Sequence, residues 1–144
     1  MYTVSTDPHR LDIPLIHRYL AEGSYWATNI PLETVERAIT NSLCFGVYGP
    51  GGGQVAFARV ITDRATFAWL CDVFVLPEFR GQGISKQLMQ EVWSHPDIRD
   101  VRRQMLATLD AHGLYEQFGF RPIPNPERYM EVKRSNPYGV PTGN

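Results

Sequence analysis

Apolar residues in the first forty positions recur every three to four residues, the period of an α-helix that packs one face on a core. Asp12 can cap the first such helix, and Gly23 can end it. A second helix is predicted from about Leu32 to Ser42, and Tyr2–Ser5 has the composition of a short strand. The apolar stripes of the two helices are Leu15, Ile16, Tyr19 and Leu20, and then Leu32, Val35, Ala38 and Ile39.

After residue 42 the pattern changes to that of β-strands. Leu43–Tyr48 is a continuous apolar run, Gln54–Thr62 is a return strand, and Ala65–Leu76 is a third strand that Pro77 stops. The run of glycines at 49–53, with Pro50 inside it, is incompatible with a helix and predicts a turn. Three consecutive strands with short connections indicate an antiparallel meander.

The remaining third of the chain alternates between helical and strand patterns. Four elements are predicted there: a helix at about Gly83–Trp93, a strand at Gln104–Leu109, a short helix at Ala111–Phe118 and a strand at Tyr129–Val132. The Pro- and Gly-rich segment Ser135–Asn144 is expected to be a loose tail, so that residues 1–134 form a single domain. A meander that continues into a strand–helix–strand unit is typical of a mixed sheet flanked by helices, an α/β or α+β fold.

Composition narrows the classes of partner. Lys and Arg total 14 against 15 Asp and Glu, so no basic field is available for a nucleic-acid backbone. No apolar run approaches the roughly 18 residues of a membrane-spanning helix, and Met1–Leu11 lacks the apolar core of a signal peptide. We therefore expect a cytoplasmic protein, in which Cys44 and Cys71 are reduced, buried thiols rather than a disulfide.

The segment Cys71–Lys86 indicates a site for an anion. It combines a buried strand, a stop, a loop that contains Gly81 and Gly83, and the first turn of a helix. First-turn amides have no partner inside the helix, and the helix dipole adds positive charge there, so the loop can hold a phosphate or pyrophosphate. The Gly-Lys-Ser/Thr of a Walker loop is absent, and Lys86 stands where a dinucleotide-binding fingerprint needs its third glycine.

The spacing of this segment resembles the acetyl-CoA signature of the GNAT superfamily of N-acetyltransferases. Arg80, Gly83 and Ser85 stand at the positions of its Arg/Gln-x-x-Gly-x-Gly/Ala pattern, although Ser85 departs from the commonest residue there. The pattern is preceded by Val75-Leu76-Pro77. A second match lies downstream, where Leu114–Phe120 resembles the family segment in which a tyrosine precedes a Gly-Phe pair.

The resemblance implies a mostly antiparallel sheet of six to seven strands flanked by about four helices. It also implies acetyl-CoA as co-substrate, bound in a cleft where the strand ending at Val75 splays from the strand ending at Leu109. The backbone of Val73, Phe74 and Val75 would pair with the pantetheine arm. The other residues implied in cofactor binding are Arg80, Gly81, Gln82, Gly83, Ile84, Ser85, Lys86 and Thr108, of which Thr108 stands where many members carry Asn.

Two residues are candidates for proton transfer. Asp72 lies in an otherwise apolar run and could deprotonate the acceptor amine; the alternatives are an ion pair with an arginine or a solvent-facing position at a sheet edge. Tyr115 could protonate the departing thiolate, the alternative being a core aromatic on a short helix. A backbone amide near Val75 would hold the oxyanion.

The acceptor is expected to be a primary amine of a small molecule or peptide. Tyr25 and Trp26, between the first two helices, could stack on it, although Trp26 could equally close the core. Arg59 and Arg64 could meet an acidic acceptor. The four histidines are scattered and predict no metal site. A homodimer through an exposed edge strand, a longer acyl donor, and a non-catalytic CoA-binding sensor or docking module all remain open.

Overall fold

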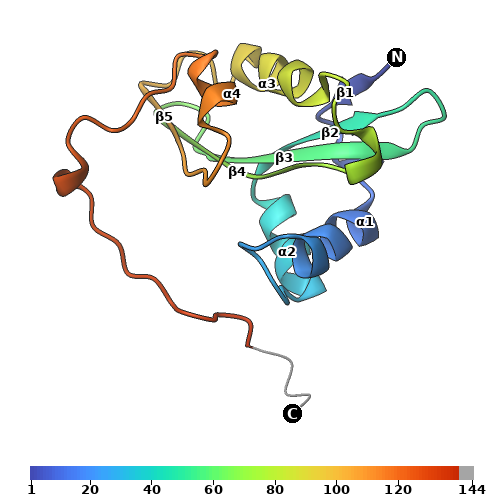
Figure 1. Ribbon diagram of the computed structural model, residues 1–144, viewed down its shortest axis with the longest axis horizontal. Coiled ribbons are helices and arrows are strands. Elements are labelled where there is room, and N and C mark those ends of the chain that lie inside the picture. The colour runs from blue at the N-terminus through green and yellow to red at the C-terminus, as the bar shows by residue number, and fades with distance from the viewer. Residues whose placement is uncertain (140–144) are drawn as a thin grey trace.

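A five-stranded sheet runs through the residues that the computed structural model describes, 1–139 (Figure 1). Strands β1 to β4 pair antiparallel in chain order, and β5 pairs parallel with β4. A parallel pair needs a crossover, which the helix between β4 and β5 supplies. The strands are β1 (Thr3–Ser5), β2 (Leu43–Tyr48), β3 (Gln54–Thr62), β4 (Phe67–Val75) and β5 (Arg103–Leu106).

Two helices cover each face of the sheet (Figure 1). On one side lie α1 (Ile13–Arg18), which continues as the π-turn η2 (Tyr19–Gly23), and α2 (Leu32–Thr40). On the other lie α3 (Ile84–Ser94) and α4 (His112–Glu116). The Asp12 side chain accepts a hydrogen bond from the Leu15 amide at 3.2 Å, as a helix N-cap does. The mixed α/β class and the four helices are therefore confirmed.

Burial follows from this layering. All six residues of β2 are buried because helices cover both of its faces, which explains its unbroken apolar run. The core between the sheet and α3 includes Phe45, Leu88 and Met89, and the core beneath α1 and α2 includes Ile16 and Phe57. Short 3-10 turns connect the elements: η1 (Pro8–Arg10), η3 (Pro77–Phe79) and η4 (Pro126–Arg128).

The expected six to seven strands are a wrong count, since residues 1–139 contain five. The predicted strand Tyr129–Val132 is irregular backbone in the structure. An apolar alternation becomes a strand only when a partner supplies the ladder hydrogen bonds, and this segment has no neighbouring strand within the described chain. It belongs to the C-terminal arm, residues 125–139, which leaves the body of the molecule (Figure 1).

Other expectations can be compared directly with the structure. Cys44 and Cys71 are free thiols, Cys44 buried and Cys71 partly exposed. Residues 135–139 of the predicted loose tail are exposed, and its last part, 140–144, lies outside the described residues. No helix in the described part of the chain has the length and apolar character needed to cross a membrane.

Candidate active site

The site begins where β4 and β5 separate. Their parallel pairing runs from Phe67 and Arg103 to Leu70 and Leu106 and then stops, while β4 continues to Val75. The β5-facing backbone groups of residues 71–75 therefore have no strand partner among the described residues. An open strand edge of this kind can pair with an extended ligand as with an added strand.

A bulge marks β4 at the start of this opening. Arg59 pairs with Cys71 and Phe57 with Phe74, so that one residue of β3 opposes two residues of β4. Asp72, inside the bulge, has a φ of +53°, which aspartate tolerates better than most residues do. The bulge turns the Asp72 side chain toward α1 and α2, where it borders Ile16 and Leu20.

The loop after β4 ends at the N-terminus of α3 with free backbone donors. Gly81 and Gly83 have φ of +81° and +79°, a left-handed conformation that favours glycine, and a Cβ at either position would meet open space. Gly83 caps α3 without any side-chain hydrogen bond. The first intrahelical bond runs from the Gln87 amide to the Gly83 carbonyl at 3.1 Å, which leaves the amides of residues 84–86 unpaired within the helix.

Side chains from distant parts of the chain hold this loop. Arg80 donates through Nε to the Val75 carbonyl at 3.0 Å and through Nη2 to the Tyr19 hydroxyl at 2.9 Å. The Tyr2 hydroxyl donates to Oε1 of Gln82 at 2.6 Å. The motif therefore predicts the loop, but the supporting Tyr2 and Tyr19 carry no local signal, since only the fold brings them there.

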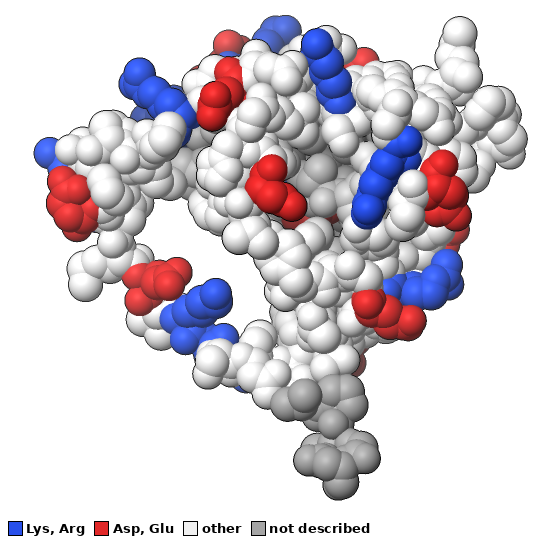
Figure 2. Space-filling model, in the orientation of Figure 1, with Lys and Arg blue, Asp and Glu red and all other residues white. Residues whose placement is uncertain are grey.

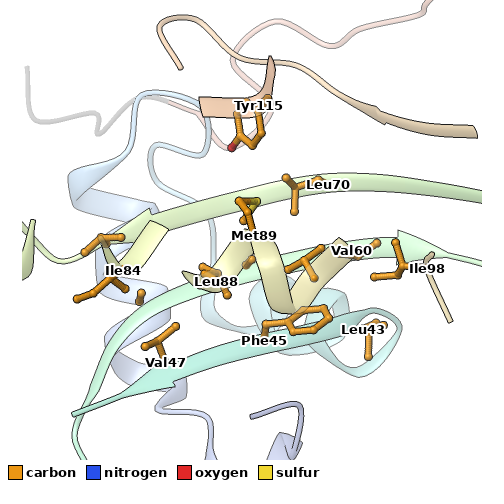
Figure 3. Close-up of a cluster of buried hydrophobic side chains, with 14 of the residues drawn as sticks. Leu43, Phe45, Val47, Val60, Leu70, Ile84, Leu88, Met89, Ile98 and Tyr115 are labelled. Carbon is orange, nitrogen blue, oxygen red and sulfur yellow. The ribbon is translucent and has the colours of Figure 1, made fainter. Parts of the chain in front are cut away.

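Tyr115 lies at the edge of the α3 core, beside the opening of the strands. It is 7% exposed and shares a cluster with Leu70, the last β4 residue that pairs with β5. Figure 3 shows Leu70 and Met89 between Tyr115 and the rest of the cluster. Burial, with a smaller effect of Asp110, raises the pKa of the Tyr115 phenol, so the phenol is protonated at neutral pH. Its hydroxyl has no hydrogen-bond partner among the described residues.

A cavity of about 490 Å³ adjoins Tyr115. Thr108, His112 and Glu116 line it together with the β5 residues 104–106. Thr108 accepts the Ala111 amide at 3.0 Å and so fixes the turn that leads into α4. His112 and Tyr115 both belong to α4, and both border this cavity.

The opposite face of the opening carries a polar cluster. Arg59 donates through Nε to Asp72 at 2.8 Å, and the side chains of the two are only 16% and 11% exposed. Nε1 of Trp26 donates to the other Asp72 oxygen at 2.9 Å, and Arg59 also reaches the Ser42 hydroxyl at 3.0 Å. The alternative that Asp72 pairs with an arginine is thus what the structure has. Arg64 pairs with Asp97 instead.

Trp26 and Tyr25 form an exposed aromatic edge beside that cluster. Their rings meet edge to face at 5.1 Å, and the residues are 43% and 65% exposed. Two solvent-facing aromatic rings beside an ion pair can stack on a flat or apolar part of a ligand. Asp72 and Trp26 therefore lie together on the α1–α2 side, whereas Tyr115 lies on the α3–α4 side.

The remaining charged and metal-ligating side chains do not form a further cluster among the described residues. Within residues 1–139, no three side chains of His, Cys, Asp or Glu come together as a metal site would require. Acidic and basic side chains are interspersed on the face shown in Figure 2. The chemistry of the region is that of backbone donors, one buried phenol and a partnered carboxylate.

Comparisons with known proteins agree with this geometry. Residues 41–122, more than half of the chain, match the family described as "Acetyltransferase (GNAT) domain". A GNAT-family structure from Xanthomonas campestris pv. campestris is 55% identical, with 97% of this chain and 98% of that chain covered and a TM-score of 0.94.

Two sequence relatives are more distant. A Gibberella zeae protein named as an acetyltransferase, FG08082, is 33% identical over 79% of this chain and 75% of its own length. The ycf52 protein of Gracilaria tenuistipitata var. liui, named as an uncharacterised N-acetyltransferase, is 30% identical over 62% of this chain and 52% of its own. The chain belongs to the GNAT family and is an acetyltransferase.

Proposed function

We propose that the enzyme transfers the acetyl group of acetyl-CoA to an amine by direct attack of that amine on the bound donor. The observation that carries the proposal is the set of unpaired amides at residues 84–86, at the mouth of the opening between β4 and β5. A diphosphate fits such amides because they combine free N–H donors with the positive end of the helix dipole. The open space over Gly81 and Gly83 leaves room for its oxygens.

The opening itself fits the rest of a coenzyme A thioester. The unpaired β4 edge at residues 73–75 would accept the amide groups of the pantetheine arm as an added strand. The same edge offers a backbone N–H for the carbonyl oxygen of the acetyl group, a donor worth about 3 kcal/mol when it is aimed at a developing oxyanion. Thr108 lines the cavity that also borders Tyr115.

Tyr115 is the proton donor in this proposal. Its phenol is protonated at neutral pH because burial raises its pKa, and it has no described partner to compete for its proton. A thiolate leaving group gains most from protonation as the carbon–sulfur bond breaks. Tyr115 lies beside Leu70, where the strands begin to separate, which is where a thioester in the opening would be cleaved.

The acceptor would approach from the α1–α2 side. Tyr25 and Trp26 line that side, and the name of the Gracilaria relative, an N-acetyltransferase, supports an amine as acceptor. An alkylamine has a pKa near 10 and must lose a proton before it attacks. Asp72 as the base stays a prediction; its contacts with Arg59 and Trp26 support a positioning role, in which it holds the aromatic edge against β4.

The experiment is a coupled measurement of coenzyme A release and acetyl-CoA affinity. With a panel of amines and peptides, the wild-type protein should release coenzyme A, and Tyr115→Phe should lower kcat about 10²-fold with the donor's Kd nearly unchanged. Equal kcat in Tyr115→Phe would remove the phenol from the mechanism. Clear thermal stabilisation by acetyl-CoA without release for any acceptor would favour a CoA-binding module instead.

A further inference from the structure

One part of the sheet on the α1–α2 side has no helix over it. Ala68 and Leu70 of β4 pack in the core between the sheet and α3. The residues that alternate with them, Phe67 and Trp69, therefore point to the opposite side. Neither of these two belongs to the core beneath α1 and α2. In Figure 1 the two helices lie under the part of the sheet away from β5, so this end of β4 is left open.

The strand register extends the open area into a shelf. Residues that pair across neighbouring strands point to the same face, so Ile61 of β3 and Met105 of β5 lie on either side of Trp69. Arg103 lies beside Phe67 in the same way. We refer to these five residues as the β4–β5 shelf. Ile61 and Phe67 are 45% and 36% exposed, and apolar groups that gather on an open face mark a binding surface.

A cavity of about 620 Å³ lies over the shelf. All shelf residues except Ile61 line it, together with Thr66, Arg102 and Tyr129. Its charged lining is thus Arg102 and Arg103, without an acidic residue from the described chain. Arg103 donates to the Tyr129 hydroxyl, and a guanidinium has further N–H donors for a second acceptor. Neither arginine forms an ion pair within residues 1–139, so both can meet an anion.

The shelf ends where the opening between β4 and β5 begins. The paired stretch of the two strands stops at Leu70, one residue beyond Trp69, and the thioester of the proposed donor would lie past that point. Trp26 adjoins the same end of the shelf through its hydrogen bond to Asp72. From the row of Phe67 to Leu70 is three residues, about 10 Å along a strand. A ligand on the shelf would therefore have one end at the opening and the other at the two arginines.

We propose that the shelf holds the acceptor, and that the acceptor is an amine with an aromatic or apolar body and a carboxylate about 10 Å from its nitrogen. This inference rests on the proposed function. The body would pack on Trp69 and Met105, while Arg102 and Arg103 bind the carboxylate. The amine would then reach the opening beside Trp26.

Charge and spacing both narrow the class of acceptor. Arg59 and Arg64, which the sequence suggested for an acidic acceptor, are each held in an ion pair. The amine and the carboxylate of a free α-amino acid share one carbon atom, so such a molecule is too short to join the arginines to the opening. An extended peptide covers the distance in about three residues. A short peptide with an acidic third residue is thus a suitable probe.

Three tripeptide amides test the inference: Gly-Phe-Glu, Gly-Phe-Gln and Gly-Phe-Lys, whose amidation removes the terminal carboxylate. With acetyl-CoA, the wild-type enzyme should give a kcat/KM about tenfold higher for the Glu peptide than for the Gln peptide, and the lowest value for the Lys peptide. The difference should lie in KM, because the charged group is remote from the reacting atoms. Equal values for the three peptides overturn the proposal.

A matched pair of charge reversals locates the carboxylate. Arg102→Glu should abolish the preference for the Glu peptide over the Gln peptide. Arg128→Glu changes the net charge equally, but Arg128 lines the cavity at the outer edge of β5 and not the one over the shelf, so this variant should keep the preference. A preference that survives Arg102→Glu, or that both variants lose alike, places the carboxylate elsewhere and overturns the proposal.

Trp69→Ala tests the apolar part of the shelf. Replacing the central Phe of the Glu peptide by Gly should raise KM about tenfold for the wild type and much less for Trp69→Ala, since the variant lacks the surface on which that ring packs. Ile61→Ala, at a more exposed position of the shelf, repeats the comparison in case Trp69→Ala does not fold. An equal effect of the Phe in the wild type and in the folded variants means that the body of the acceptor lies elsewhere.

Calorimetry with the Glu peptide keeps this inference apart from the proposed function. Binding to the wild type that weakens in Arg102→Glu, without coenzyme A release from any peptide, would contradict the proposed function and retain the shelf as a site for acidic peptides. Coenzyme A release from all three peptides without preference would support the proposed function and overturn the inference.

Discussion

The two edges of strand β4 adjoin two differently built parts of the sheet. Toward β3 and β2 it joins long strands that are paired on both sides and covered on both faces, and all six residues of β2 are buried. Toward β5 it joins a strand of four residues, none of them buried, which has one strand partner among residues 1–139 and a cavity along its outer edge. We refer to strands β1–β4 with the helices that cover them as the core side, and to β5 and the elements that follow it as the edge.

The active-site region lies where these two parts meet, and each part supplies a different element. The core side holds the loop at residues 80–83, because Arg80 donates to the Val75 carbonyl and Tyr2, on β1's side of the sheet, donates to Gln82. The edge supplies Tyr115 and Thr108, on short elements with fewer contacts. If the proposed function holds, donor binding depends on the core side and proton transfer depends on the edge.

The largest effect should come from the core side. Leu88 on α3 is fully buried, so Leu88→Ala leaves a cavity and should lower the free energy of unfolding by about 3 kcal/mol. Leu106→Ala on β5, a partly exposed position, should cost about 1 kcal/mol. Urea unfolding followed by circular dichroism gives both values, and equal losses would mean that the edge is as firmly packed as the core.

Sequence predicted the core side almost completely. The strand ranges Leu43–Tyr48 and Gln54–Thr62 were expected and are confirmed, because long apolar runs bounded by glycines have one plausible structure. The family resemblance is confirmed by the comparisons as well. The Asp72 bulge was not expected, since its only local signal is that aspartate tolerates a positive φ.

The edge was predicted less well, for a physical reason. The pattern at Tyr129–Val132 indicates a strand, but whether a strand forms depends on a neighbour that local sequence does not specify. In the same way, Asp72 was recognised as unusual, while its partner Arg59 lies on another strand and was considered for a different task. Roles that depend on pairing across the fold follow from the structure, and those of Asp72 and Tyr115 in catalysis stay predictions.

The next largest effect is expected for Asp72, on the α1–α2 side of the sheet. Asp72→Asn keeps a residue that tolerates positive φ and a carbonyl oxygen for Trp26, but it leaves the mostly buried Arg59 without its counter-charge. We expect a loss of about 2 kcal/mol in the free energy of unfolding, measured by urea titration. If Asp72 only positions Trp26, the pH profile of kcat/KM should keep its shape; loss of the acidic limb of that profile would identify Asp72 as the base.

Alkaline pH should lower the free energy of unfolding through two thiols of the core side, Cys44 on β2 and Cys71 on β4. Burial raises the pKa of the Cys44 and Cys71 thiols from 9.0 to about 12, with Arg59 opposing the rise in both. Between pH 9 and 12 the unfolded chain has lost these protons and the folded chain has kept them. The stability that the thiols contribute is thus fully present below pH 9 and is lost as pH rises, by about 1.4 kcal/mol per pH unit for each thiol.

The measurement is the difference between two unfolding curves taken at several values of pH. A variant with Cys44→Ala and Cys71→Ala lacks both thiols, while its other titrating groups are those of the wild type. The wild type should lose stability more steeply than this variant above pH 9, and parallel curves would mean that the thiols ionise as easily in the folded protein. Neither thiol should react with a neutral-pH thiol reagent until the protein unfolds.

The smallest change in stability is expected for a glycine variant that distinguishes an effect on acetyl-CoA affinity from an effect on folding. Gly83→Ala places a Cβ at a φ of +79°, which should cost about 1 kcal/mol of stability even though that Cβ meets open space in the protein. Gly52, in the turn between β2 and β3, has a φ of +90° and equally open surroundings, so Gly52→Ala carries a similar backbone cost far from the site. Calorimetry with acetyl-CoA should find weaker binding for Gly83→Ala alone, because only there does the added methyl group stand between the diphosphate and the amides of residues 84–86. Similar affinities in the two variants would place the diphosphate elsewhere and leave those amides without a ligand.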